Sequence, residues 1–365
     1  MPQADHASLI TKNRLGILGG GQLGRMMIEN GAGLAKKFIV WDKNKDSPAM
    51  ALSSHNIIAA FDDKMALQEF LSAIDSVVIE WENIPTQLVE KIAKHKPIIA
   101  PASILGIAQS RQAEKKFFLT SPIHPAPFAI LSASDDRAMM IKKITTANLT
   151  LPAILKTDRL GYDGKGQYII KTIDDILAAI ENQTGDFVLE QKINFISEGS
   201  VLVARDRYGK VISYPMVENI HKNGILHSTS YPAKKISPAL QKTAIHATKQ
   251  MANKLNLIGL LCVEYFISHD EKLIANEMAP RPHNSFHWTI EAVTISQFLQ
   301  ITRIALGLSA IEPEVKANGA TMYNILGDDI NHHKKWHNKK NYFLHLYGKT
   351  IATPNRKMGH YTILS

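Results

Sequence analysis

LLCVEYFISHDEKLIANEM, residues 260–278, is the stretch that decides the fold, because two apolar runs in it flank a short polar turn. This pattern predicts a β-hairpin with strands from Leu260 to Ile267 and from Lys272 to Met278. In that register Glu264 lies directly opposite Glu277, and opposed residues of an antiparallel pair have Cβ atoms about 5 Å apart. We therefore expect two carboxylates side by side on one face of a sheet.

The paired glutamates indicate a cation site. Two carboxylates at that separation repel each other unless divalent cations lie between them, and Asn276 offers a further oxygen ligand. The competing interpretation is a solvated acidic pair, which is less well supported because both glutamates interrupt otherwise apolar strands. A shift of one residue in the pairing would place Glu264 and Glu277 on opposite faces of the sheet.

A proline-bounded segment, MAPRPHNS at residues 278–285, follows the second strand. It predicts a loop, neither helix nor strand, that carries Arg281, His283 and Asn284 next to the acidic pair. Donors beside a cation site suit an anionic ligand. Alternatively, these side chains bond to their own backbone, as loop residues often do.

A glycine-rich segment, LKTDRLGYDGKGQ at residues 155–167, predicts a strand that runs into a loop able to close over phosphates. Glycine lets backbone N–H groups approach phosphate oxygens, while Lys156 and Lys165 supply positive charge. An ordinary glycine-rich hairpin is an equally good interpretation of the segment alone. The glycines concerned are Gly161, Gly164 and Gly166.

The segment GGGQLG at residues 19–24 has the G-x-G-x-x-G spacing after a predicted strand, and Asp42 ends the next one. This combination is typical of dinucleotide-binding enzymes. A helix N-terminus with glycines also accepts the phosphate of any other substrate, and a tight turn without a ligand fits equally well. The motif alone leaves all three interpretations open.

The strand pattern divides the chain into regions. Short apolar strands alternate with helical segments near the N-terminus, which predicts a parallel α/β unit. After a lysine-rich helix beginning near Arg111, we expect a second domain with a mixed, partly antiparallel sheet. The N-terminal strands are expected at residues 14–18, 38–41, 77–80 and 97–100, and the later ones at residues 154–156, 168–170, 187–190, 201–206, 260–267 and 272–278.

Composition sets wider limits. A chain of 365 residues suggests two or three domains, and 45% hydrophobic with 21% charged residues is typical of globular proteins. The net charge of +9 suits phosphorylated substrates, nucleic acid or an acidic membrane surface. We expect no nucleic-acid and no membrane partner, because the basic run from Asn331 to Lys340 offers only Trp336 for stacking and no apolar run has membrane length. A single cysteine, Cys262, and no signal sequence predict a cytoplasmic protein.

Taken together, seven segments resemble one family, the 5-(carboxyamino)imidazole ribonucleotide synthases, which are the ATPase subunits of phosphoribosylaminoimidazole carboxylase and a branch of the ATP-grasp superfamily. The acidic pair alone indicates only the superfamily, whereas the last three segments are more specific. The segments are GQLGRM (21–26), EWENI (80–84), GYDGKGQ (161–167), EQKINF (190–195), NEMAPRPHNS (276–285), HWT (287–289) and RKMGH (356–360).

The resemblance implies an enzyme of combined α/β and α+β class that works as a homodimer. Its parts would be an N-terminal tail (1–13), a Rossmann-like parallel α/β domain (14–110), an ATP-grasp domain (111–311) and a short β-rich C-terminal domain (312–365). Members of the family continue beyond the RKMGH segment, so we expect the C-terminal domain to be truncated. The implied substrates are ATP, bicarbonate and 5-aminoimidazole ribonucleotide, with two Mg²⁺ ions on Glu264 and Glu277.

The resemblance also assigns roles to residues. Those assigned to ATP are Arg111, Lys156, Gly161, Tyr162, Asp163, Gly164, Lys165, Gly166, Gln167, Glu190, Gln191, Lys192, Ile193, Glu198, His221, Asn276 and Glu277, with Glu190 to Ile193 as the adenine-binding strand. Those assigned to the ribonucleotide are Gly21, Gln22, Leu23, Glu82, Tyr162, Arg356 and Lys357. The catalytic group is Lys156, Lys165, Arg281, His283 and Asn284, with His283 and Tyr162 as candidates for the general base.

The implied reaction is attack of bicarbonate on ATP, giving carboxyphosphate, followed by carboxylation of the 5-amino group. Other functions remain open from sequence. They are an ATP-grasp ligase that uses formate, a Rossmann-type oxidoreductase that would leave the glutamate pair without a role, and a catalytically inactive binding protein.

Overall fold

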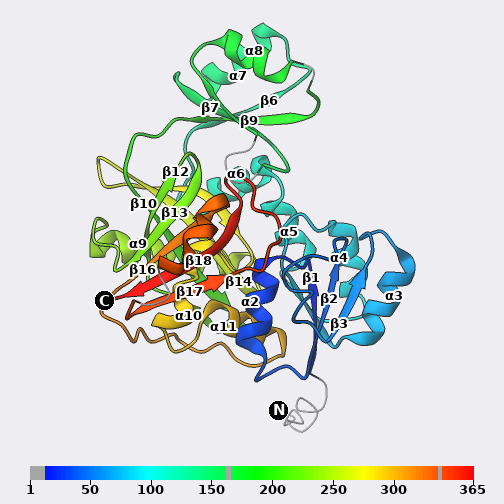
Figure 1. Cartoon of the computed structure of the whole chain (residues 1–365). Helices are drawn as coiled ribbons and strands as arrows, with labels where there is room; N and C mark the ends of the chain where they lie inside the picture. The colour runs from blue at the N-terminus through cyan, green and yellow to red at the C-terminus, as the bar shows by residue number, and fades with distance from the viewer. Residues whose placement is uncertain (1–12, 162–165, 182, 336–338) are drawn as a thin grey trace.

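The structure, a computed structural model, describes residues 13–161, 166–181, 183–335 and 339–365. Three β-sheets organise these residues (Figure 1). Most of the expected N-terminal tail, residues 1–12, lies outside the described part of the chain. No helix among the described residues is long and apolar enough to span a membrane.

The N-terminal sheet has five parallel strands in the order β3-β2-β1-β4-β5. Its inner strands are apolar on both faces, because helices cover the sheet. The predicted parallel α/β unit is confirmed; β3 was not predicted, since only one of its four residues is buried. The strands are β1 (Arg14–Leu18), β2 (Lys37–Asp42), β3 (His55–Ile58), β4 (Ser76–Ile79) and β5 (Ile98–Ile99), and the helices are α2 (Gln22–Gly31), α3 (Lys64–Ala73), α4 (Thr86–Ala93) and α5 (Ala102–Ala108).

A small lobe contains a four-stranded antiparallel sheet in the order β6-β9-β7-β8 (top of Figure 1). Two helices pack their apolar residues on this sheet around the buried Leu131, Leu155 and Leu189. The lobe follows α6 (Arg111–Leu119), whose first turn is capped by the Ser110 hydroxyl. The elements of the lobe are β6 (Phe128–Ser132), α7 (Arg137–Thr146), β7 (Ala153–Thr157), β8 (Gln167–Ile170), α8 (Ile173–Ile180) and β9 (Asp186–Gln191).

The largest sheet has nine strands. Eight follow the order β15-β14-β10-β12-β13-β16-β18-β17, and β11 pairs with β10. The three C-terminal strands join it through the β13–β16 pair. The strands are β10 (Phe195–Arg205), β11 (Val211–Ser213), β12 (Val217–Lys222), β13 (Ile225–Tyr231), β14 (Gly259–Ser268), β15 (Leu273–Ala279), β16 (Ala320–Leu326), β17 (Tyr342–Leu346) and β18 (Lys357–Leu364), and the helical segments are α9 (Pro238–Lys254), η1 (Asn284–Phe286), α10 (Thr289–Ala292), α11 (Gln297–Ala305) and η2 (Gly327–Lys335).

Three local expectations were wrong. The later strands do not form one mixed sheet; they divide into two sheets whose strand pairs are all antiparallel. Asn284 is not in an irregular loop, because it begins the 3₁₀ turn η1. Lys192 and Ile193 do not belong to the strand of Glu190, since β9 ends at Gln191 and the chain then turns into β10.

Gly259 lies where β14 begins beside the N-terminal sheet. Its φ is +129°, and a Cβ built there would lie 2.5 Å from the Cγ2 atom of Ile99. We predict that Gly259→Ala lowers the apparent free energy of unfolding by about 2 to 4 kcal/mol, measured by urea denaturation, because backbone strain and overpacking both act. Gly185→Ala is the matched control, since Gly185 also has a positive φ, +95°, but no atom lies within 4 Å of the position that its methyl group would take. Equal losses in the two variants would contradict the role of the Ile99 contact.

Candidate functional site

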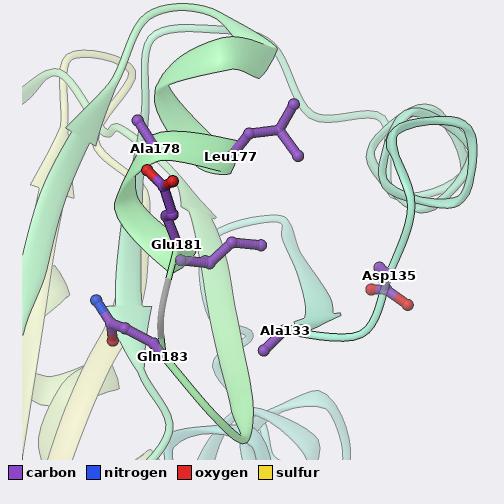
Figure 2. Close-up of a pocket in the computed structure, with 7 residues that line it drawn as sticks. Ala133, Asp135, Leu177, Ala178, Glu181 and Gln183 are labelled. Atoms are coloured by element: carbon purple, nitrogen blue, oxygen red, sulfur yellow. The ribbon is translucent and has the colours of Figure 1, made fainter.

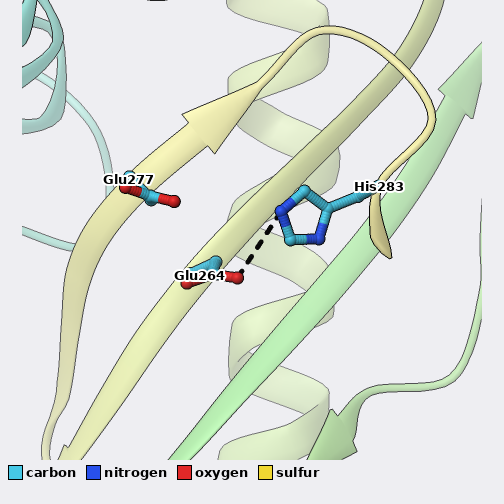
Figure 3. A group of neighbouring side chains, drawn as sticks. All are labelled: Glu264, Glu277 and His283. Atoms are coloured by element: carbon cyan, nitrogen blue, oxygen red, sulfur yellow. Dashed lines mark ion pairs between the residues drawn. The ribbon is translucent and has the colours of Figure 1, made fainter. Parts of the chain in front are cut away.

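The predicted pairing of the two glutamates is confirmed. β14 and β15 are antiparallel, with Glu264 directly opposite Glu277 and a register shift immediately afterwards. His283 from the following loop joins them, so that one ligand atom from each of the three residues lies within 4.8 Å of the others. Figure 3 shows the two carboxylates on the same side of neighbouring strands, with His283 reaching back toward Glu264. The expected convergence of acidic side chains is therefore present.

Negative charge at this cluster is only partly compensated by the protein. Glu264 is 8% exposed, and burial, followed by the charge of Glu277, raises the pKa of Glu264 to about 7. Arg111 Nη1 lies 3.9 Å from Glu277 Oε2, whereas His283 Nε2, at 3.5 Å from Glu264 Oε1, belongs to a ring whose pKa is held well below its usual value by burial and by the charge of Arg281. Two hard carboxylates fit Mg²⁺, which prefers oxygen ligands, whereas the His283 nitrogen does not add to that preference. The assignment of the pair to Mg²⁺ stays a prediction.

A buried carboxylate shared by two lysines lies at the start of the small lobe. Glu190 Oε2 is 3.1 Å from Lys115 Nζ and 3.0 Å from Lys156 Nζ. Although burial opposes ionisation, the two lysines lower the pKa of Glu190 to about 2, so it is charged. Burial lowers the pKa of Lys156. Lys156 thus lies on β7, as expected, and pairs with Glu190 on β9; its assignment to phosphates stays a prediction.

Helix α6 supplies residues that sequence reasoning missed. Lys115 Nζ donates to the backbone oxygen of Asn276 at 2.8 Å, and the Met278 N–H donates to Glu114 Oε1 at 2.6 Å. Burial raises the pKa of Glu114 to about 8. These two contacts hold β15 in place on both sides of Glu277. A signal was present in the sequence, since Glu114 and Lys115 share the apolar face of Phe117 and Phe118 at helical spacing.

His221 and Glu198 form a second acid–base pair on adjacent strands. His221 Nδ1 lies 2.5 Å from Glu198 Oε2, between β12 and β10. Burial disfavours the charged imidazolium, but the bond to Glu198 raises the pKa of His221 above its usual value. The charges of Glu264 and Glu277 also act on His221, so the pair belongs to the same electrostatic environment as the glutamate cluster.

The N-terminal sheet contributes Glu82, which pairs with Arg281. The Nε and Nη2 atoms of Arg281 lie 2.8 Å and 2.6 Å from Glu82 Oε2, and Nη1 donates to the backbone oxygen of Pro282. This contact joins the loop after β15 to the carboxyl end of β4. The two residues, predicted to serve catalysis and the ribonucleotide, are therefore brought together.

The glycine-rich turn before α2 is filled by the protein's own carboxylates. The Gly20 N–H donates to Asp42 Oδ2 at 2.6 Å, and the Leu23 N–H donates to Glu80 Oε1 at 3.1 Å. A Cβ at Gly21 would lie 2.4 Å from Glu80 Oε1, so glycine is required by a carboxylate rather than by a phosphate. Sequence reasoning gave Glu80 no role. This occupation weakens the dinucleotide interpretation, because the pyrophosphate would need these N–H groups.

The remaining predicted residues are positioned as follows. Asn284 exchanges side-chain hydrogen bonds with Asn324 on β16, at 3.0 Å and 2.6 Å. Lys357 begins β18, and its positive charge acts on Glu264, whereas the Arg356 guanidinium donates to the Ile351 backbone at 2.7 Å. Gln22 begins α2 beside Gly21, and Gln167 begins β8 directly after Gly166. The side-chain oxygen of Gln191 accepts a hydrogen bond from the Thr150 N–H, and the backbone oxygen of Gly161 accepts one from Arg111. Tyr162, Asp163, Gly164 and Lys165 lie outside the described residues.

A separate hollow of about 560 Å³ lies in the small lobe, between α8 and the β6–α7 connection (Figure 2). None of its lining residues belongs to the glutamate cluster. Its one aspartate, Asp135, already accepts hydrogen bonds from Lys143 and from the Ser132 N–H. The hollow therefore contributes nothing to the candidate site.

Three family models match the chain. They are the ribonucleotide synthetase preATP-grasp domain at residues 12–109, the ATP-grasp domain at residues 121–298 and the phosphoribosylaminoimidazole carboxylase C-terminal domain at residues 320–365. The chain is 38% identical over 363 residues to the N5-carboxyaminoimidazole ribonucleotide synthase of Brucella melitensis, covering 98% of both proteins. It is 35% identical over 354 residues to that of Bacillus subtilis, covering 96% of this chain and 91% of the relative.

Solved structures of N5-carboxyaminoimidazole ribonucleotide synthases also match the chain. The ADP complex of an N5-carboxyaminoimidazole ribonucleotide synthetase matches with a TM-score of 0.90 at 35% identity, covering 97% of this chain and 92% of that one. An Aspergillus clavatus synthase in complex with ADP and 5-aminoimidazole ribonucleotide matches with a TM-score of 0.87 at 27% identity, covering 97% and 94%. The predicted combination of a preATP-grasp α/β domain with an ATP-grasp fold is thereby confirmed.

The charge on Glu190 makes stability depend on pH. Its pKa is depressed in the folded protein, so its contribution is complete above the ordinary glutamate value of about 4.5 and is lost as pH falls toward 2. We predict that Glu190→Gln lowers the free energy of unfolding at pH 7 by about 3 kcal/mol, because two buried lysines lose their counter-charge. Denaturant unfolding between pH 5 and pH 3 should also show a shallower pH dependence than in wild type. Glu90→Gln, at an exposed position, serves as control, and equal slopes in the two variants would contradict the assignment.

Proposed function

The chain belongs to the N5-carboxyaminoimidazole ribonucleotide synthase family, and we propose that it catalyses the ATP-dependent carboxylation of 5-aminoimidazole ribonucleotide with bicarbonate. The products would be N5-carboxyaminoimidazole ribonucleotide, ADP and phosphate, a step of de novo purine biosynthesis. The observation that carries this proposal is the convergence of Glu264 and Glu277 on paired strands, with Arg111 and His283 beside them.

The glutamate pair is proposed to hold Mg²⁺. Two carboxylates facing each other on paired strands, one of them buried with a raised pKa, form a donor set that a hard divalent cation would stabilise. When bound, the metal would neutralise charge on the triphosphate oxygens. Arg111, beside Glu277, and Lys156, beside Glu190, would contact the same phosphates. ATP would therefore lie with its phosphates between the small lobe and β14–β15.

The ribonucleotide is proposed to lie on the other side of the cluster, toward the N-terminal sheet. Arg281 and Glu82 form its boundary there, and the turn of Gly21, Gln22 and Leu23 lies at the carboxyl end of the same sheet. Because Asp42 and Glu80 already occupy N–H groups of this turn, the phosphate of the substrate would be held by Arg356 and Lys357 instead. The amino group would then face the glutamate cluster.

The proposed chemistry has three steps. A bicarbonate oxygen attacks the γ-phosphorus, the bond to ADP breaks, and carboxyphosphate forms; it then releases carbon dioxide and phosphate. The 5-amino nitrogen attacks the carbon dioxide, and its proton leaves to a base, for which His283 is the candidate among the described residues. The protein's part is to bring two anions together and to exclude water from carboxyphosphate, a task assigned to the loop from Gly161 to Gln167.

The nearest alternative is an ATP-grasp ligase that uses formate. A coupled assay of ADP release, with and without 5-aminoimidazole ribonucleotide, bicarbonate and formate, separates the two. Stimulation by bicarbonate and not by formate supports the proposal, and the reverse result would exclude it. We also propose, from the same family membership, a homodimer that works in the cytoplasm.

We predict that Glu277→Gln abolishes ADP formation, with a loss of at least about 10³-fold, while the far-ultraviolet circular dichroism spectrum stays that of wild type. An amide cannot supply the negative charge that the cation and phosphates require. The matched control is Glu271→Gln, at an exposed position in the turn of the same hairpin. Near-normal turnover of Glu277→Gln would remove the metal assignment.

We predict that Lys357→Ala weakens binding of the ribonucleotide by roughly tenfold or more and leaves the affinity for ATP little changed. The reason is the loss of a cation from the end of the sheet assigned to the substrate phosphate. Isothermal titration with each ligand measures the two affinities, and Lys242→Ala, an exposed position on α9, is the control. An equal loss for both ligands would argue that Lys357 acts structurally.

A further inference from the structure

Gln297, the first residue of α11, holds the backbone of His283 with both ends of its amide. The His283 N–H donates to Gln297 Oε1 at 2.8 Å, and Gln297 Nε2 donates to the His283 carbonyl at 2.9 Å. The side chain is fully buried. A backbone N–H can only donate and a carbonyl can only accept, so these two contacts fix which end of the amide is oxygen and which is nitrogen.

This orientation determines the state of a second histidine. Gln297 Nε2 also lies 3.0 Å from Nδ1 of His287. Because Gln297 Nε2 carries only hydrogens, this contact assigns His287 Nδ1 as the acceptor and places the ring hydrogen on His287 Nε2, which is buried and has no hydrogen-bond partner among the described residues. Burial lowers the pKa of His287 well below its usual value, which agrees with a neutral ring.

The clamp connects the loop after β15 to the N-terminal domain. Helix α11 packs against α2, and the Ser296 hydroxyl, one residue before Gln297, bonds to Asn30 Oδ1 at 2.7 Å. The loop held by Gln297 carries Arg281, which binds Glu82, and His283, which approaches Glu264. A single buried amide thus sets the position of a backbone segment between the two sides of the candidate site.

We propose that Gln297 is a positioning residue for carboxyl transfer, which fixes the backbone of His283 and the tautomer of His287 so that the Arg281–His283 loop meets the ribonucleotide in one geometry. The kinetic consequence rests on the proposed function, whereas the tautomer does not. Loss of the clamp would disturb transfer to the amine more than cleavage of ATP, since Lys156 and the glutamate pair are held by other elements.

The chain provides a matched control in Gln300, one turn later on α11. Gln300 is also fully buried, and it holds the backbone of Ile311 in the same two-ended manner, with contacts of 2.8 Å and 3.4 Å. Neither of these contacts involves a residue of the candidate site. Substitutions at Gln300 therefore reproduce the loss of a buried amide clamp without moving the Arg281–His283 loop.

The first experiment measures the wild-type protein and uses a variant only to identify signals. Nitrogen NMR of the protein labelled with ¹⁵N-histidine, with the His287 signals identified by their loss in His287→Asn, reports which ring nitrogen carries hydrogen. We expect a neutral ring with hydrogen on Nε2. A neutral ring with hydrogen on Nδ1, or a charged ring, at neutral pH would overturn the proposal.

The second experiment compares Gln297→Met and Gln297→Glu with the same changes at Gln300. Methionine keeps the volume but removes all three bonds, and glutamate removes the donors to the His283 carbonyl and to His287. We expect kcat/KM for carboxylation to fall roughly 10- to 100-fold at Gln297, the KM for ATP to stay constant, and ADP release per carboxylated product to rise. In Gln297→Glu the hydrogen of His287 should move to Nδ1.

The control variants decide between positioning and general destabilisation. We expect Gln300→Met and Gln300→Glu to keep the wild-type ratio of ADP to carboxylated product, even where their thermal stability falls. Equal losses of coupling at both positions, or unchanged coupling at Gln297, would overturn the proposal. If wild type shows no bicarbonate-dependent ADP release, the proposed function fails, and the NMR result still tests the clamp.

Discussion

The site depends on the pairing of β14 with β15, which forces Glu264 and Glu277 to face each other in a partly buried position. Burying one carboxylate beside another is unfavourable, because desolvation and repulsion act in the same direction. The surrounding residues compensate only in part, and helix α6 contacts the strand on both sides of Glu277. Arg111 approaches Glu277, Glu114 fixes the backbone of Met278, and Lys115 joins Asn276 to Glu190. One helix thus links the hairpin to the small lobe.

Much of the fold and part of the site could be predicted from sequence. The hairpin was predictable because its apolar runs and polar turn set the register locally, and the parallel strands because each is a short apolar run between helical segments. The division of the later strands into two sheets was not predictable, since strand patterns do not specify partners far apart in sequence. Glu80, Lys115 and Gln297 were missed for a related reason. A buried polar residue is recognised by the partners that satisfy it, and those partners come from distant segments.

The glycine-rich turn before α2 shows how one motif can serve different ends. Its spacing is typical of dinucleotide-binding folds, yet Asp42 and Glu80 accept the hydrogen bonds that a pyrophosphate would need. Glu80 also lies two residues from Glu82, which binds Arg281. At the carboxyl end of β4, Glu80 therefore accepts a hydrogen bond from the N-terminus of α2, whereas Glu82 binds the loop after β15. Under the proposed function, anions are therefore assigned to arginine and lysine side chains and not to this turn.

The nine-stranded sheet is continuous from β15 to β17, so the glutamate pair and Lys357 stand on the same sheet. The charge of Lys357 acts on Glu264 although several strands separate β14 from β18 in the sheet order, so the sheet curls and brings the start of β18 within electrostatic range of the pair. The small lobe has its own sheet and contributes no strand to this one. A substitution that flattened this sheet would therefore separate Lys357 from the acidic pair without altering either of them.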